Sequence, residues 1–122
     1  MRITDRILLR GLQPFLAEGA EVLAIERVRT DALGEERKAN AVLTDEHLLI
    51  VTAVRVKSVL TEVPRTDIRS IEILGDDHVA VGFEDFAHAR HRVIDIELRR
   101  KGDRNGFLAQ LTAPPGGQPP VT

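Results

Sequence analysis

Residues 39–52 read Ala-Asn-Ala-Val-Leu-Thr-Asp-Glu-His-Leu-Leu-Ile-Val-Thr, and this stretch decides the fold class. It holds two runs of aliphatic and β-branched residues, 39–44 and 47–53, separated only by Asp45-Glu46. Two such runs with a short polar connection predict a β-hairpin. Thr44 and Asp45 suit the turn because their side chains can bond nearby backbone amides.

More strands are predicted on both sides of this hairpin. Upstream, residues 21–30 are rich in Val, Leu and Ile, and 31–38 form a polar loop. Downstream, Pro64 ends the run 54–63, and Asp67 opens a tight turn. Two alternating runs follow on either side of the turn signal at 75–77. Their alternating apolar residues, which predict half-buried strands, are Ile71, Ile73, Val79, Val81 and Phe83.

Residues 90–100 give the clearest strand pattern of the chain. Ile94, Ile96 and Leu98 point one way, and the charged residues between them point the other. A short final helix follows after Gly102-Asp103, with an apolar side of Phe107, Leu108 and Leu111. The Pro/Gly-rich tail 113–122 can bury almost nothing, so we expect it to be disordered or extended.

The first residues predict a separate helix. Thr4 and Asp5 suit its N-cap, Pro14 restarts it as a short turn, and Gly19 closes it. An apolar stripe runs along one side at helical spacing, formed by Ile7, Leu8, Leu12 and Phe15. This stripe packs on the core of the same chain or faces a partner, and both possibilities stay open at this point.

The order of elements predicts a mainly β domain, a bent antiparallel barrel of about seven strands with a helix at its C-terminal end. We expect an N-terminal helical extension at 1–18, the domain itself at 19–112 and a tail at 113–122. A length of 122 residues allows one real core.

Composition excludes several classes of protein. With a net charge of −2, the chain lacks the cationic excess that a general nucleic-acid binder needs. It has no cysteine, which excludes disulfides, zinc–thiolate sites and a cysteine nucleophile. The first nineteen residues are interrupted by charged residues, among them Arg2, Asp5, Arg6 and Arg10, so we expect neither a signal peptide nor a membrane span there, and a cytoplasmic location.

Three stretches resemble phrases of the bacterial pleckstrin-homology-like domains, relatives of the PH and GRAM domains. They are Gly19-Ala-Glu-Val-Leu23, the hairpin 39–52, and Val63-Pro-Arg-Thr-Asp-Ile-Arg-Ser-Ile-Glu-Ile73, which is similar to the family's "Ile-Pro-Leu-x-Asp-Ile" phrase. The resemblance covers residues 19–112 and implies a PH-like barrel. Its motifs consist of turn and core residues, so they indicate a fold rather than a function.

Phosphoinositide-binding PH domains carry a basic signature across the first hairpin. Arg29 and Arg37 match its first two positions, but Ala39 occupies the last one. Glu35 and Glu36 add negative charge where an inositol phosphate would bind, and nearby carboxylates oppose a polyphosphate. We therefore do not transfer the lipid site to this chain.

Candidate metal and catalytic groups are weak. His88-Ala-Arg-His91, with His78 and Asp76-Asp77 upstream, is the one cluster with metal-ligating side chains, but its neighbouring arginines repel a cation. Neither Ser58 nor Ser70 lies in a nucleophile elbow, and Gly102–Gly106 lacks the ending of a phosphate-binding loop. We expect no metal, no cofactor and no enzymatic activity.

One charge feature stands out in residues 90–104. Its cations exceed its carboxylates by three, and they are Arg90, Arg92, Arg99, Arg100, Lys101 and Arg104. This run is either a solvated strand face or a weak patch for an anionic surface. We predict a non-catalytic binding module that binds a protein partner or assembles with itself into a homo-oligomer. The alternative is a peripheral membrane or lipid-headgroup binding module.

Overall fold

The computed structural model describes residues 10, 16, 19–32, 34, 36–52, 59–99 and 104–112. Seven strands form one antiparallel sheet in the order β4-β3-β2-β1-β7-β6-β5. The strands are β1 (Val22–Thr30), β2 (Arg37–Thr44), β3 (His47–Thr52), β4 (Val59–Pro64), β5 (Ile68–Ile73), β6 (His78–Asp85) and β7 (Arg90–Leu98). The predicted seven-stranded, mainly β fold is thus confirmed.

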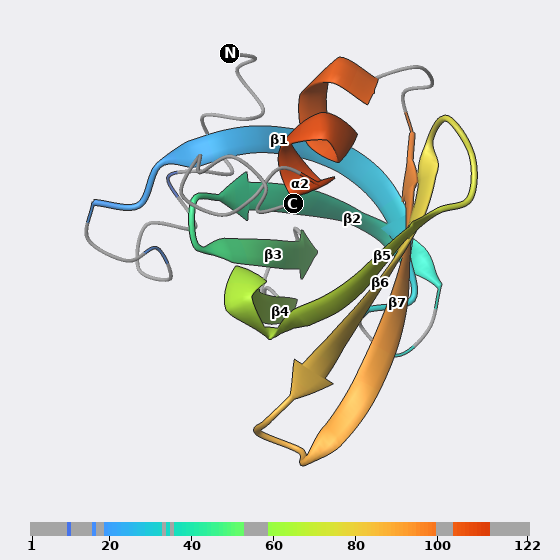
Figure 1. The fold of residues 1–122 in the computed structure, drawn as a ribbon. Helices are drawn as coiled ribbons and strands as arrows, with labels where there is room; N and C mark the ends of the chain where they lie inside the picture. The colour runs from blue at the N-terminus through green and yellow to red at the C-terminus, as the bar shows by residue number, and fades with distance from the viewer. Residues whose placement is uncertain are drawn as a thin grey trace, which may run out of the picture.

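The sheet bends so that its two halves enclose a common interior (Figure 1). β1 pairs with β2 along its whole length but with β7 only at Val28–Thr30, so the bend falls along β1. Between β4 and β5 the chain makes a single 3-10 turn, η2 (Arg65–Asp67). A tight turn is present near the predicted place, but it ends at Asp67 instead of opening there.

A C-terminal helical segment closes one end of the barrel. It consists of η3 (Arg104–Leu108), with a break at Gly106, and α2 (Ala109–Thr112). The predicted apolar side is buried, with Phe107, Leu108 and Leu111 each at most 3% exposed. They join the main core, whose strand members include Val28, Leu43, Ile50, Val81 and Ile96.

A second, smaller apolar cluster covers the outer face of β1–β3. Val42, Leu49 and Val51 form it, and Leu16, Val22 and Ile25 pack against it. Residues 48–51 are continuously apolar because β3 contributes side chains to both clusters. The predicted N-terminal stripe of Ile7, Leu8, Leu12 and Phe15 lies outside the described residues, as does the tail 113–122.

The predicted turn chemistry is confirmed for Thr44, whereas Asp45 bonds an amide far away in the sequence. The Thr44 hydroxyl accepts hydrogen bonds from the amides of Glu46 (3.2 Å) and His47 (2.9 Å). The Asp45 carboxylate accepts one from the Glu21 amide at 3.2 Å, which ties the hairpin to the start of β1.

Some predicted boundaries are wrong. The polar loop 31–38 is shorter, because β2 begins at Arg37. The sequence also predicts a loop at 84–89, which is shorter because β6 continues to Asp85. β6 is also buried on both faces rather than half-buried. Its outward residues Ala80 and Gly82 are small, and the larger side chains of the flanking strands cover them; Gly82 lies beside Ser70 and the His91 ring.

Candidate binding groove

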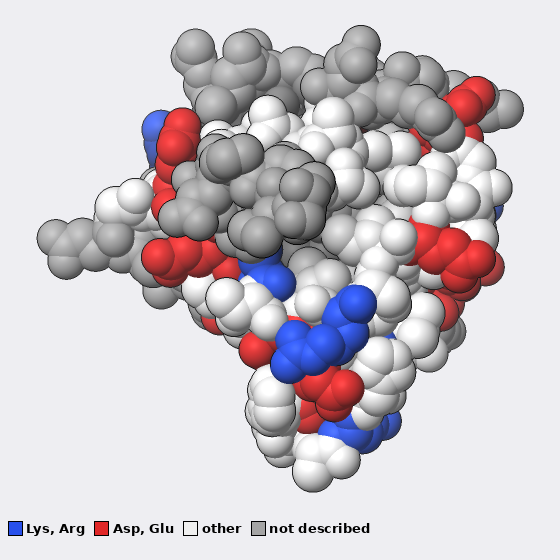
Figure 2. Space-filling view, viewed as in Figure 1, with Lys and Arg blue, Asp and Glu red and all other residues white. Residues whose placement is uncertain are grey.

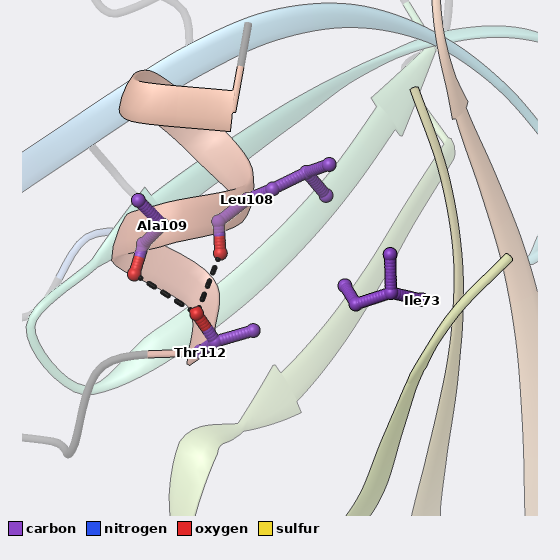
Figure 3. A pocket seen from close by; sticks show the side chains of 4 residues that line it. All are labelled: Ile73, Leu108, Ala109 and Thr112. Carbon is purple, nitrogen blue, oxygen red and sulfur yellow. Dashed lines mark hydrogen bonds between the residues drawn. The ribbon is translucent and has the colours of Figure 1, made fainter. Parts of the chain in front are cut away.

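An apolar groove lies between β5 and the C-terminal helical segment. Ile73 of β5 forms one wall, and Leu108, Ala109 and Thr112 form the other (Figure 3). Its volume is about 230 Å³. For comparison, a cavity of about 150 Å³ is sufficient for a benzene ring. The groove therefore has room for one large apolar side chain.

The lining is apolar even though it includes a threonine. The Thr112 hydroxyl donates to the carbonyl oxygens of Leu108 (3.0 Å) and Ala109 (3.2 Å) within its own helix. Figure 3 shows the Thr112 methyl turned toward Ile73. The hydroxyl is thus already satisfied, so the groove offers carbon surface rather than an acid, a base or a nucleophile.

Two exposed aliphatic residues stand at the end of β5. Ile73 is 43% exposed and the adjacent Leu74 is 49% exposed. In Figure 2 the surface between the helical segment and the end of β5 is white, without Lys, Arg, Asp or Glu. Ile73 thus gives the groove one exposed apolar wall.

β5 is an edge strand whose backbone can accept another strand. Within the described part of the chain it pairs only with β6. The Leu74 amide donates to the His78 carbonyl at 2.9 Å, and Ile73 lies opposite Val79. Hydrogen-bonded and non-hydrogen-bonded pairs alternate in an antiparallel ladder. The N–H and C=O groups of Ile71 and Ile73 therefore point away from β6, toward the free edge.

A buried arginine fixes the helical wall of the groove. Arg65 is 6% exposed. Its guanidinium donates to the carbonyls of Thr44 (3.4 Å), Gln110 (3.0 Å) and Leu111 (3.5 Å). Burial lowers the pKa of Arg65, and the nearby Asp45 carboxylate opposes that shift. A cation at the C-terminal end of a helix also stabilises the carbonyls that lack helical partners.

The other end of the barrel is closed by its own polar contacts. The carbonyl of Ala32, in the β1–β2 loop, accepts from Thr61 (3.2 Å) and from Arg92 (2.9 Å). Arg92 also lies 5.6 Å from the centre of the Phe83 ring. The side chain of Arg92 thus joins β7 to the loop.

The first hairpin places opposite charges together. The Arg29 guanidinium lies 3.5 Å from the Glu36 carboxylate. Across the β1–β2 ladder, Arg29 is opposite Lys38 and Thr30 is opposite Arg37. Glu35 lies outside the described residues. A carboxylate thus accompanies Arg29, the first position of the lipid-binding signature.

The predicted cationic run 90–104 does not form one patch among its described members. Arg90 and Arg92 lie at one end of β7, and their side chains approach the Asp85 carboxylate at 3.7 Å and 3.9 Å. Arg99 follows the other end of β7. Seven residues of extended strand separate Arg92 from Arg99 by about 23 Å. Arg100, Lys101 and the side chain of Arg104 lie outside the described residues.

Each of the four histidines lies next to a carboxylate. The pairs are His47–Glu62 (3.3 Å), His78–Asp95 (3.6 Å), His88–Asp85 (2.9 Å) and His91–Glu84 (3.2 Å). The predicted metal candidates His88 and His91 thus have different partners. Among the described residues, no three His, Asp or Glu side chains are arranged to hold a metal ion.

Comparisons with known proteins identify the fold. No family model matches the chain, and no curated protein is significantly similar to it. Two solved structures are similar: the crystal structure of an N-terminally truncated linker-DH/PH fragment of p115-RhoGEF, with a TM-score of 0.63 at 11% identity, and one of the DH/PH domains of a point mutant of p115-RhoGEF, with a TM-score of 0.64 at 12% identity. The chain has a PH-like fold.

The alignments cover 93% and 94% of this chain but only 35% and 36% of the p115-RhoGEF chains. This chain thus corresponds to about a third of those structures. At such low identity the likeness carries the fold alone. Within the described part of the chain, no helix has the length and hydropathy needed to cross a membrane.

Sequence reasoning missed the groove and the arginine that supports it. Arg65 was a usable signal, since it stands where the similar family phrase has leucine. This signal alone does not show that Arg65 donates to the carbonyls of the C-terminal helical segment.

Proposed function

We propose that the chain is a non-catalytic protein-interaction module that binds an extended segment of a partner protein in the groove beside β5. The observation that carries the proposal is the combination of a free strand edge with an apolar groove along it. Strand addition uses main-chain hydrogen bonds for affinity and side-chain pockets for specificity. Here, Ile71 and Ile73 offer the backbone groups, and the groove of about 230 Å³ offers the pocket.

The geometry defines the kind of segment that fits. It is extended, because it pairs with β5, and it carries one large aliphatic or aromatic side chain that enters the groove. The neighbouring β5 side chains Arg69 and Glu72 are exposed and have opposite charges, so they select no strongly charged partner. No group in the lining can perform acid–base or nucleophilic chemistry, which supports a binding role.

Self-assembly is a second possible occupant, because two copies can pair their β5 edges. The lipid-headgroup alternative has less support, because Arg29 lies beside the Glu36 carboxylate and Arg92 lies near the Asp85 carboxylate. Strand addition by a partner is preferred because a partner segment can pair with the β5 edge and also place a side chain in the groove.

The test starts from peptides selected on the full chain from a library of random linear segments. We expect selected peptides to share an apolar residue and to lose affinity for the Ala109→Arg variant, because arginine at this exposed helix position fills the groove. Gln110→Arg is the matched control, since it adds the same charge at the neighbouring exposed residue. Equal affinity for wild type and both variants would contradict the proposal.

Light scattering separates the second occupant from the first. A full chain that is monomeric at high micromolar concentration leaves the edge free for a partner. If the chain forms a dimer and Ala109→Arg or Ile73→Asp dissociates it, the occupant of the groove is a second copy of this chain rather than a partner protein.

A further inference from the structure

The β6–β7 hairpin projects beyond the rest of the sheet. β5 pairs with β6 only as far as Phe83, and β1 pairs with β7 only at Ile96–Leu98. The stretch from Glu84 to His91 thus has no strand beside it within the described part of the chain. Figure 1 shows this hairpin extending away from the barrel, at the end opposite the C-terminal helical segment.

The turn of this hairpin carries the one exposed aromatic side chain in the described part of the chain. It reads Phe86-Ala-His-Ala89, and Phe86 is 68% exposed, whereas Phe83 and Phe107 are at most 4% exposed. Ala89 has a φ of 51°, a left-handed conformation that usually calls for glycine or asparagine. The turn thus keeps a large apolar ring in water and accepts backbone strain. Such departures from local rules are characteristic of functional sites.

Asp85 holds this turn in shape from the inside. Its carboxylate accepts a hydrogen bond from the His88 amide (3.3 Å) and contacts the His88 ring (2.9 Å). The Asp85 side chain is 12% exposed, whereas those of His88 and Arg90 are 68% and 59% exposed. The Phe86 ring is therefore presented on a fixed turn, which limits the conformational freedom that is lost on binding.

The hairpin also presents unpaired backbone groups. The Leu98 amide donates to the Asp77 carbonyl at 2.6 Å, so these two residues form a hydrogen-bonded pair of the β6–β7 ladder. Such pairs alternate with non-hydrogen-bonded ones, and by this alternation Glu84 and His91 form a non-hydrogen-bonded pair. Their N–H and C=O groups point outward from the two sides of the hairpin. The hairpin is thus an extended segment whose edges can pair with another strand.

We propose that the segment bound in the groove is the β6–β7 hairpin of a second copy of this chain, with the Phe86 ring between Ile73 and Thr112. This inference rests on the proposed function and names its partner. The groove of about 230 Å³ has room for the ring, because a cavity of about 150 Å³ is sufficient for benzene. The hairpin meets both requirements of that function, since it is extended and carries one large apolar side chain.

The charges around the two surfaces are complementary. The turn that follows Ile73 contributes the carboxylates of Asp76 and Asp77 on the side of the groove. On the tip, the groups that face outward are those that can carry positive charge, His88 and Arg90. Complementary charges across an interface favour the encounter and fix its orientation. Pairing of two β5 edges, by contrast, would leave the Phe86 ring in water.

The contact joins two different surfaces of the molecule. The tip and the groove lie at opposite ends (Figure 1), so a chain cannot fill its own groove with its own tip. Each copy therefore binds one neighbour through its groove and another through its tip. Such a head-to-tail contact repeats until the copies close into a ring or continue as a filament. Pairing of two β5 edges would instead end at a dimer.

Two variants that each lack one surface test this contact. Phe86→Ala removes the ring from the tip, and Ala109→Arg fills the groove; both residues are exposed, and circular dichroism checks that both variants are folded. In sedimentation equilibrium up to millimolar concentration, we expect the full chain to form species larger than a dimer. Each variant should lower the association constant about tenfold to a hundredfold, the range expected for losing one buried phenyl side chain.

An equimolar mixture of the two variants gives the sharpest readout. The intact tip of Ala109→Arg can bind the intact groove of Phe86→Ala, so the mixture should form a heterodimer with the affinity of one wild-type contact. The matched controls are Gln110→Arg and Val93→Ala, which alter an exposed residue beside the groove and an exposed apolar residue of β7. Both should associate like the wild type.

Three results would each overturn the inference: a full chain that stays monomeric at millimolar concentration, a Phe86→Ala variant that associates like the wild type, or a mixture that does not pair. The proposed function is judged separately, by the peptides selected on the full chain. If the chain is monomeric and Ala109→Arg still abolishes peptide binding, another protein supplies the segment and only the inference about the second copy fails.

Discussion

Replacing Arg65 by methionine tests how the barrel holds the helical wall of the groove. Methionine keeps the unbranched apolar stem of the side chain in this 6% exposed position, but it removes the guanidinium and every hydrogen bond that it makes. The carbonyls of Thr44, Gln110 and Leu111 then lose the donors that they have at 3.4, 3.0 and 3.5 Å. The change therefore acts on the contact between the β2–β3 turn and the end of α2.

The size of the effect follows from these contacts. A hydrogen bond to a charged group contributes about 1.5–3 kcal/mol net. Only the bond to Gln110 has ordinary length, so we count it fully and the two longer ones in part. Part of this loss is offset, because folding the wild type removes the guanidinium from water at a cost in free energy that the methionine variant avoids. We expect a net loss of about 2–3 kcal/mol in the free energy of unfolding, or roughly 10 °C in Tm.

Urea unfolding followed by circular dichroism measures this loss. Arg69→Met is the matched control, because Arg69 also donates to a carbonyl, that of Thr66 at 2.8 Å, but is exposed. It should change stability by less than about 0.5 kcal/mol. If Arg65→Met were as stable as Arg69→Met, the reasoning about the buried guanidinium would be refuted. Arg65→Lys should fall between them, since one ammonium cannot reach three carbonyls as a fork does.

Three further changes test other parts of the molecule. Phe107 is fully buried, so Phe107→Ala should lower the free energy of unfolding by about 3–5 kcal/mol, measured by the same urea titration; a loss under about 1 kcal/mol would contradict its place in the core. Ala89→Gly should raise stability slightly, by about 0.5 kcal/mol, because relief of the left-handed strain exceeds the extra freedom of the unfolded glycine chain; clear destabilisation would count against the turn geometry. Burial alone would raise the pKa of Asp85, but the hydrogen bonds from His88 and the charges of His88 and Arg90 lower it overall. When the native pKa lies below the unfolded value of about 3.9, the charged carboxylate stabilises the fold at pH values above about 3.9, and this stabilisation is lost as the pH falls through the native pKa. Wild type should thus exceed Asp85→Asn in stability at pH 7, with the gap closing below about pH 4; a gap that widens in acid would be inconsistent with this sign.

The sequence predicts the strands well because their side chains alternate. At 90–100 the alternation of Ile94, Ile96 and Leu98 with charged residues corresponds to β7, where those three are buried. The turn at Thr44 is predictable for a similar reason, since its hydroxyl bonds amides within three residues. Such features depend on neighbours along the chain.

Features that depend on distant residues were not predictable. The burial of both faces of β6 arises because Ala80 and Gly82 are small and the flanking strands cover them. The groove joins Ile73 to Thr112, and Arg65 reaches a helix 45 residues away. The cations of 90–104 are close in sequence, yet a strand separates Arg92 from Arg99 in space. Composition cannot show such distances, because only the folded topology sets them.

Hydrogen exchange at the β5 edge tests the central claim most directly. The amides of Ile71 and Ile73 point to the free edge, whereas the Leu74 amide is bonded to His78 at 2.9 Å. In the free chain we expect fast exchange at Ile71 and Ile73, and slower exchange at Leu74. A saturating peptide selected on the full chain should slow exchange at Ile71 and Ile73 by tenfold or more, as for amides that gain a strand partner. Unchanged exchange at these two amides, with protection appearing instead at the β1–β2 hairpin, would contradict strand addition in the groove.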